Sequence, residues 1–114
     1  MSTPAGLTPI FADVPVEIAP SHRVAEFPPG TFLESIAVRA DGTLFVSSHL
    51  DGKVLRLGAD GVPVVHAAIA GKATGLALTP AGDLLLTAWD AGGIPTLYTI
   101  SPQGVVTVLV ILPD

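Results

Sequence analysis

The chain of 114 residues contains no cysteine, few charged residues and no long apolar run. Without cysteine, disulfide bridges, thiolate metal ligands and cysteine nucleophiles are all excluded. Charged residues make up only 13% of the sequence, which is about half of the usual share. The longest apolar stretches, such as residues 108–112, are far shorter than the ~20 residues that a membrane-spanning helix needs. The sequence therefore predicts neither a disulfide-stapled scaffold nor a transmembrane helix.

Basic residues are especially scarce. Five Lys and Arg stand against ten Asp and Glu, which gives a formal net charge of −5. A nucleic-acid backbone or an anionic membrane surface would repel such a chain, so we expect no nucleic-acid partner and no membrane partner. Residues 1–20 contain four prolines and neither a basic region nor an unbroken apolar region. This pattern argues against a signal peptide, and we expect a cytoplasmic protein.

The residues that are abundant are apolar, and they come in short runs. Hydrophobic residues make up 49% of the sequence, and the mean hydropathy is +0.65. From residue 24 onward, runs of four to seven apolar residues alternate with turn clusters rich in Gly, Asp and Pro. Short runs separated by Asp-Gly and similar pairs are typical of strands and hairpins, and no window shows helical periodicity with capping residues. We predict an all-β fold.

An internal repeat refines this prediction. Residues 35–44 align with residues 75–84 at an offset of 40, and residues 54–57 align with residues 97–100 at an offset of 43. A period of about 40 residues with four short strands in each repeat is typical of a β-propeller blade. Several runs are apolar at consecutive positions, which indicates sheets covered on both faces, as stacked blades are. We predict four-stranded antiparallel meanders that form about two blades of a six-bladed propeller.

The predicted organisation follows from this alignment. Residues 1–23 form a Pro-rich lead-in, and residues 24–114 form a partial propeller that begins with an orphan outer strand at 24–27. Blade one covers residues 35–67 and blade two covers residues 75–111. The strands are expected at 35–39, 43–48, 53–57, 62–67, 75–79, 84–88, 96–100 and 105–111.

Two blades cannot close a ring, and their outer faces would leave apolar residues exposed. We therefore expect that the chain is the N-terminal part of a longer propeller or that it completes a ring by self-association. The orphan strand favours the first alternative, because an N-terminal strand commonly supplies the outer strand of the last blade.

The blade openings carry a resemblance to a known family. Residues 27–38, FPPGTFLESIAV, and residues 40–47, ADGTLFVS, resemble the gluconolactonase/regucalcin (senescence-marker-protein-like) superfamily. Residues 74–84, TGLALTPAGDL, are similar to the repeated blade opening of that superfamily. The resemblance covers about residues 24–114, and its motifs also resemble those of other six-bladed propellers.

The resemblance implies a six-bladed propeller with one divalent metal, calcium or zinc, in the central channel, and hydrolysis of lactone or sugar-like small molecules. The metal-binding Glu of the family corresponds to Glu34. An Asn of the family, in a blade opening, corresponds to Thr74, and threonine is a poor substitute for an amide oxygen ligand. The remaining ligands would lie in other blades, so we expect the isolated chain to be inactive.

Strand direction gathers the chemistry-bearing residues at one mouth of the predicted sheets, because alternate connections of an antiparallel meander share one end. Glu34 is a candidate metal ligand there or an exposed acid, and Asp90 is a candidate catalytic base or ligand. His49, close to Asp51, is a candidate pocket residue or a solvated loop residue. Trp89 and Thr74 complete the candidate pocket, in which Trp89 would stack on a sugar-like ring or cap the blade.

Two functional hypotheses follow. The first is that the chain forms part of a metal-dependent, gluconolactonase-type lactone hydrolase. The second is a non-catalytic propeller scaffold that binds a ligand or a protein, and Thr74 in place of an amide ligand favours it.

Overall fold

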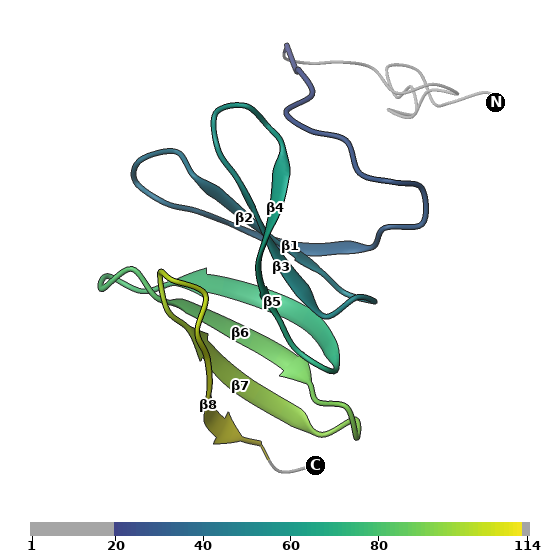
Figure 1. Ribbon diagram of the computed structural model, residues 1–114, viewed down its shortest axis with the longest axis vertical. Coiled ribbons are helices and arrows are strands. Elements are labelled where there is room, and N and C mark those ends of the chain that lie inside the picture. The colour runs from purple at the N-terminus through teal and green to yellow at the C-terminus, as the bar shows by residue number, and fades with distance from the viewer. Residues whose placement is uncertain (1–19, 113–114) are drawn as a thin grey trace, which may run out of the picture.

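The computed structural model describes residues 20–112, and these residues form eight β-strands (Figure 1). The strands are β1 (Leu33–Val38), β2 (Leu44–Ser48), β3 (Lys53–Leu57), β4 (Pro63–Ala68), β5 (Lys72–Leu78), β6 (Leu84–Trp89), β7 (Pro95–Ile100) and β8 (Val106–Ile111). Every predicted strand from residue 35 onward is present, with bounds that differ by at most three residues. The described part of the chain contains no helix, so the all-β prediction is confirmed.

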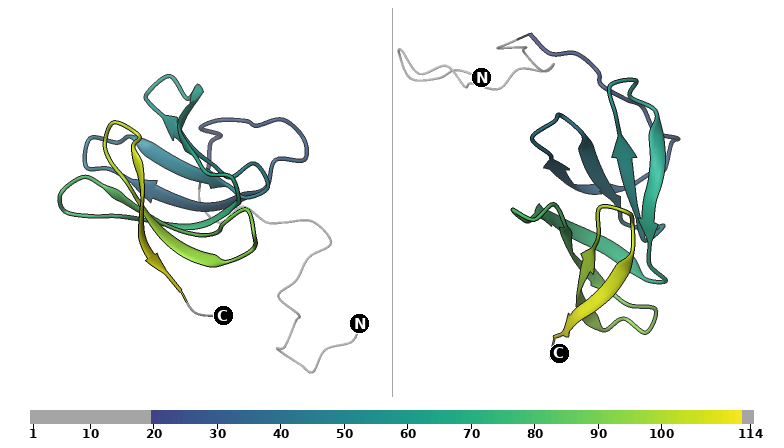
Figure 2. Two further views of the ribbon diagram at one scale, coloured as in Figure 1. Left: turned by 60° about the horizontal axis from the view of Figure 1, so that its bottom comes forward. Right: turned by 60° about the vertical axis from the view of Figure 1, so that its left-hand side comes forward.

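The strands form two separate four-stranded antiparallel sheets, in the orders β1-β2-β3-β4 and β5-β6-β7-β8. We call the first sheet blade one and the second sheet blade two. Figure 2 shows the two sheets as layers that pack on one another. Their registers match at the predicted offset, because Ala37 pairs with Phe45 in blade one and Ala77 pairs with Leu85 in blade two. The predicted repeat is therefore a structural repeat.

Two hairpin turns with the same geometry connect the first two strands of each blade. Gly42 N donates to Arg39 O at 2.8 Å, and Gly82 N donates to Thr79 O at 3.0 Å. Gly42 and Gly82 have φ angles of 90° and 93°, in the left-handed region where glycine avoids the Cβ clash of other residues. This is the chemistry of a short hairpin loop that ends in a glycine bulge.

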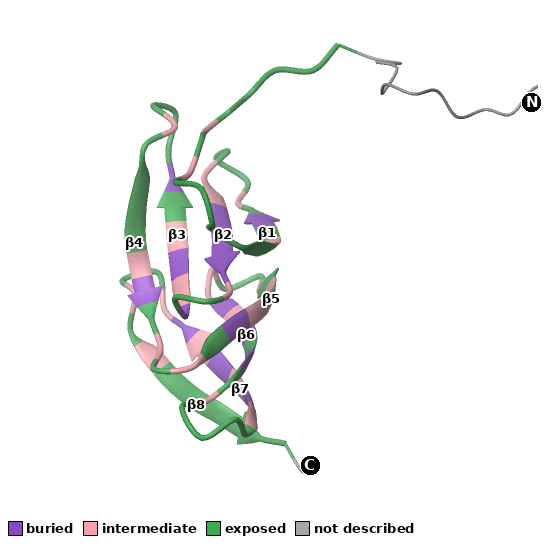
Figure 3. Cartoon of the chain, turned by 90° about the vertical axis from the view of Figure 1, so that its right-hand side faces the viewer, coloured by how far each residue is buried: buried purple, intermediate pink, exposed green. Residues whose placement is uncertain are grey.

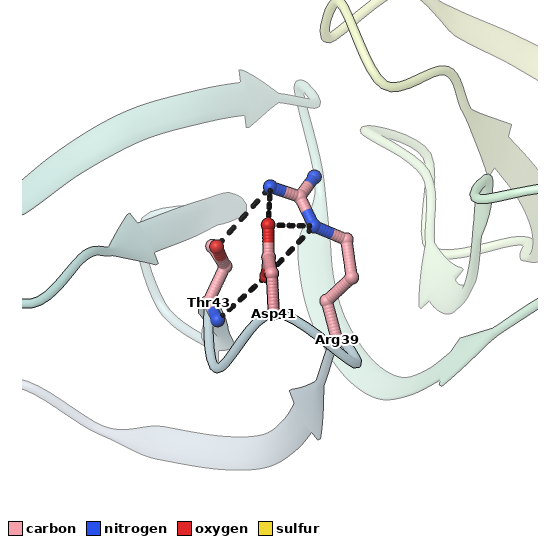
Figure 4. A network of polar contacts seen from close by, with 3 residues as sticks. All are labelled: Arg39, Asp41 and Thr43. Carbon is pink, nitrogen blue, oxygen red and sulfur yellow. Dashed lines mark hydrogen bonds and ion pairs between the residues drawn. The ribbon is translucent and has the colours of Figure 1, made fainter.

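The side chains of the first turn hold its shape (Figure 4). The Arg39 guanidinium donates to both carboxylate oxygens of Asp41 and to Thr43 Oγ1, and Thr43 N donates to Asp41 Oδ1 at 3.0 Å. The hydrogen bond from Arg39, followed by that from Thr43 N, holds the pKa of Asp41 well below its usual range. Asp41 is thus a turn residue, as the Asp-Gly pattern at residues 41–42 indicates.

The hydrophobic core lies between the two sheets (Figure 3). Each strand of blade one contributes one buried residue to the core, and β5, β6 and β7 of blade two contribute the other six. The buried core residues are Ala37, Phe45, Val54, Ala67, Ala73, Leu84, Leu86, Ala88, Tyr98 and Ile100. Leu86 and Ile100 are completely buried, so each contributes about 1.5–3 kcal/mol through removal of its side chain from water.

Hydrogen bonds near the innermost strands, β1 and β5, join the two blades. Ser47 Oγ donates to Thr74 O at 2.6 Å, and Leu76 N donates to Ser35 Oγ at 3.2 Å. Ser47 is completely buried, so its hydroxyl needs this partner to offset the loss of water. These hydrogen bonds fix the register in which one blade packs on the other.

The segment before β1 forms no strand among its described residues, 20–32. The predicted orphan strand at residues 24–27 is irregular, and Val24, Ala25 and Phe27 instead line a hollow on the outer face of blade one. No neighbouring strand of the described chain offers this segment an antiparallel partner, which is the physical reason for the difference. Pairing of residues 24–27 with a last blade stays a prediction. The rest of the predicted lead-in, residues 1–19, lies outside the described residues.

Within residues 20–112, no helix has the length and apolar character that crossing a bilayer requires. The cytoplasmic location stays a prediction.

The connection between β4 and β5 contains a close approach that generates a test. A Cβ atom placed on Gly71 would overlap the backbone of Trp89 and Asp90 at the end of β6. Neither backbone segment can shift without moving a strand. We therefore expect Gly71→Ala to lower the free energy of unfolding by about 1–3 kcal/mol. Urea unfolding followed by circular dichroism measures this change. In the matched control, Gly58→Ala, the nearest atom to the new Cβ is Asp60 Oδ1 at 4.0 Å, and the change should stay within about 0.5 kcal/mol. Equal effects of the two substitutions would contradict the close packing.

Candidate functional site

Four segments meet at one end of the two sheets, and we call this end the mouth. They are residues 30–34, 49–52, 69–74 and 89–95. His49 N donates to Phe32 O at 2.8 Å, Ile69 N donates to Gly52 O at 2.7 Å, and Ala73 N donates to His49 O at 3.2 Å. The connections that strand direction predicts at one end therefore do lie together.

His49 is the central residue of the mouth. Its Nδ1 donates to Ala73 O at 2.8 Å, which links the end of β2 to the start of β5 in the other blade. Its ring is half-buried and contacts two aromatic rings, Phe32 at 5.2 Å and Trp89 at 5.9 Å between centroids. The interpretation of His49 as a solvated loop residue is therefore wrong, because the hydrogen bond and both ring contacts hold the side chain between the blades.

These contacts create an aromatic row across both blades, made of Phe32, His49 and Trp89. The side chains at its two ends are open to solvent, with Phe32 50% exposed and Trp89 44% exposed. Two large aromatic surfaces that remain accessible beside a fixed imidazole are suited to stacking on a flat or ring-shaped ligand. Sequence analysis missed Phe32, although its place two residues before Glu34 could have indicated a residue at the mouth.

Glu34 lies on β1 at an irregularity of the β1–β2 pairing. Leu33 pairs with Ser48 and Ser35 pairs with Ser47, so Glu34 is the extra residue of a β-bulge. Bulges commonly redirect a side chain next to a functional site. Glu34 is exposed, and it lines the hollow on the outer face of blade one together with apolar residues such as Leu33 and Ile36.

Thr74 occupies the equivalent bulge of blade two, between the pairs that Ala73 and Leu76 form with β6. Its hydroxyl donates to Thr87 O at 2.5 Å and lies 2.8 Å from Thr87 Oγ1. Thr87 Oγ1 also accepts from Gly75 N at 2.9 Å. The hydroxyl of Thr74 therefore stabilises the bulge of its own blade.

Asp90 lies in the turn between β6 and β7, and its carboxylate is used locally. Asp90 Oδ1 accepts hydrogen bonds from Gly92 N and from Ile94 N, each at 2.9 Å. These two bonds hold the turn in the manner of an Asx-turn. The catalytic role proposed for Asp90 stays a prediction, and the geometry assigns the residue a turn-stabilising role.

The described residues do not form a metal site by themselves. No three His, Asp or Glu side chains within residues 20–112 gather closely enough to hold a metal ion. Glu34 is an exposed carboxylate at the mouth, the hydroxyl of Thr74 is committed to Thr87, and one oxygen of Asp90 is committed to its turn. A divalent ion of calcium type takes six or more oxygen ligands, so this set does not fit one.

His66 lies on β4, the strand of blade one farthest from β1, where the blade contacts Ser101 of blade two. Its ring contacts Phe45 edge-on at 5.1 Å between centroids, and Nε2 donates to Ser101 O at 3.2 Å. Burial lowers the pKa of His66 below its ordinary value of 6.5, and the charges of Arg56 and Arg39 lower it further, against the hydrogen bond to Ser101 O. His66 is thus held neutral as part of the packing.

This lowered pKa predicts a pH-dependent stability. Below pH 6.5 His66 is protonated in the unfolded chain, whereas in the folded chain it stays neutral to a lower pH because its pKa is lowered. The free energy of unfolding therefore falls as the pH drops from about 7 to about 5. The carboxylate of Asp41 loses its stabilising contribution only below about pH 4, outside this window. Thermal unfolding at both pH values measures the effect. His66→Gln should flatten the dependence, whereas the exposed His22→Gln should retain it. An unchanged pH dependence in His66→Gln would refute this origin.

No protein-family model and no curated protein sequence matches the chain. Among solved structures, the chain is similar to virginiamycin B lyase from Staphylococcus aureus, with a TM-score of 0.59 and 18% sequence identity. The match covers 74% of this chain and 28% of that chain. At this identity the likeness shows the fold alone, which for that enzyme is a six-bladed β-propeller. The two sheets described here are therefore propeller blades, as predicted, and the chain spans little more than a quarter of its structural neighbour.

Proposed function

We propose that the two blades belong to a β-propeller that binds a small molecule with a sugar-like or lactone ring at the mouth. The observation that carries this proposal is the aromatic row of Phe32, His49 and Trp89. The row crosses from one blade to the other, and this is where a propeller can offer a surface built from several blades at once. The function is a binding function, in agreement with the scaffold alternative.

The chemistry of the row supports this ligand class. Aromatic faces stack on flat or ring-shaped ligands, and the apolar body of the ring contributes most of the contact area. The rigid frame around the row supports ordered binding, since His49 is fixed by Ala73 O and Phe32 O accepts a hydrogen bond from His49 N. Residues held by such a scaffold lose little conformational entropy when a ligand binds.

A second candidate is a gluconolactonase-type lactone hydrolase. It is favoured by one observation, the exposed carboxylate of Glu34 on the inner-strand bulge at the mouth. The match covers 28% of the neighbour's chain, and two blades are about a third of a six-bladed ring. The two numbers are close, which supports a complete ring of six blades. A calcium or zinc ion would need further ligands from outside the described residues, so no catalytic step is assigned to this chain alone.

The binding proposal is testable through the single tryptophan of the chain, Trp89. Addition of glucono-lactone or of simple sugars should quench or shift the fluorescence of Trp89, since the ring is 44% exposed at the row. Phe32→Ala should weaken binding by about tenfold, because removal of one stacking partner is worth about 1 kcal/mol or slightly more. The control Val62→Ala removes an equally exposed apolar residue, 56% exposed, from a turn at the opposite end. A wild-type spectrum that no ring compound changes would refute the proposal.

The hydrolase candidate makes a different prediction. If Glu34 is a ligand of a divalent cation, lactone opening measured in a pH-stat should require calcium, zinc or manganese. Glu34→Gln should then reduce the rate of lactone opening by at least tenfold. Asp51→Asn is the matched control, because Asp51 is an exposed acid in the β2–β3 turn at the same mouth. Because the described residues do not form a metal site by themselves, the assay applies to a closed ring that supplies the further ligands. Equal cation-dependent rates for the wild type and Glu34→Gln in that ring would remove the hydrolase candidate and leave the binding proposal standing.

A further inference from the structure

Each blade has one face in the shared core and one face without a partner in the described chain. The free face of blade one carries a hollow of about 340 Å³. Its lining is mostly apolar and includes Leu33, Ile36, Leu44, Val46 and Leu57, with Glu34 and Ser35 as its polar members. The free face of blade two carries a smaller hollow of about 250 Å³, lined mainly by Leu76, Ala77, Leu85, Thr87 and Leu97.

The repeat shows what the free face of blade two is built to contact. The residues of blade one that face blade two include Ala37, Phe45, Ser47 and Val54. At the offsets of 40 and 43 residues, they correspond to Ala77, Leu85, Thr87 and Leu97. All four of these lie on the free face of blade two. Blade two therefore presents outward the surface equivalent to the one through which blade one contacts blade two.

The converse holds for the free face of blade one. Blade two packs on blade one through Leu76, Leu84, Leu86 and Ile100. At the same offsets, these residues correspond to Ile36, Leu44, Val46 and Leu57, which are among the apolar residues that line the hollow on blade one. The two free faces are thus the two halves of one interface, and that interface is already present inside the chain.

We propose that a second copy of this chain docks by placing the free face of its blade one on the free face of blade two. The new contact continues the interface between the blades in the same register, with apolar residues at the apolar positions and a hydroxyl residue, Thr87, at the position of Ser47. Because the contact is head-to-tail, it leaves one free face at each end, and rotation closes the series into a ring. Three copies close a ring of six blades, which is the number in the structural neighbour.

Two differences weaken the interface between copies relative to the one inside the chain, apart from side-chain replacements such as Phe45 by Leu85 and Ser47 by Thr87. Ser35 Oγ accepts from Leu76 N within the chain, but the position equivalent to Ser35 in blade two is Gly75, so this bond is missing between copies. Residues 24, 25 and 27 line the hollow on blade one, so this segment moves aside when a second copy docks. Both differences weaken the contact, and assembly therefore depends on protein concentration.

Two single substitutions test the proposal with the full chain. Ile36 is 58% exposed on the free face of blade one, and Ala77 is exposed on the free face of blade two. Ile36→Asp and Ala77→Asp should both fold, because neither residue is buried, and circular dichroism verifies this. Leu50→Asp is the matched control, since Leu50 is 51% exposed in the β2–β3 turn and lies on neither free face.

Light scattering coupled to size-exclusion chromatography measures the mass across a concentration series. The wild type and Leu50→Asp should reach three times the 11.6 kDa of the chain, and each face variant alone should remain at 11.6 kDa. An equal mixture of the two face variants should form dimers and stop there, because it retains one intact pair of faces.

A wild type that stays monomeric, or association that Ala77→Asp leaves intact, would overturn head-to-tail docking. A mixture that stays monomeric would overturn it as well, and an open series of masses would overturn closure at three copies. Neither hollow is lined by Phe32, His49 or Trp89, so the fluorescence of Trp89 and the measured mass succeed or fail independently.

Discussion

The packing of one sheet face on another is the constraint from which the rest of the structure follows. Residues from all four strands of blade one, among them Ala37 and Ala67, pack in one cluster with Leu86 and Ile100 of blade two. This packing brings β1 beside β5. The buried hydroxyl of Ser47 then reaches Thr74 O, so the apolar packing and the polar contacts determine the same relative position.

That position assembles the mouth from segments far apart in the sequence. Gly52 and Gly71 have no side chains, and the backbones of the β2–β3 turn, the β4–β5 connection and the end of β6 therefore lie in direct contact. The ring of His49 fills the place where the two blades meet, between Phe32 and Trp89. The aromatic row is therefore a consequence of blade packing, and it does not depend on any single loop.

The fold could be predicted from the sequence because its signals are local. Asp-Gly and similar pairs mark the turns, consecutive apolar residues mark sheets covered on both faces, and the offset of 40 residues connects the two blades. The site was less predictable because its contacts are not local. The roles of His49 and Asp90 depend on acceptors and donors that only the folded chain supplies, Ala73 O for His49 and two turn amides for Asp90. Phe32 has no motif of its own, and its importance appears only when His49 and Trp89 lie beside it.

The matching bulges of the two blades have a wider consequence. Glu34 and Thr74 occupy the same place in successive repeats, yet one is an acid and the other a neutral hydroxyl residue. The side chain at this place is outside the shared hydrophobic core, so both an acid and a hydroxyl residue are compatible with the packing of the blades. Gene duplication of such a unit would copy the scaffold while leaving one variable position per copy, and selection could then adjust the central opening one unit at a time.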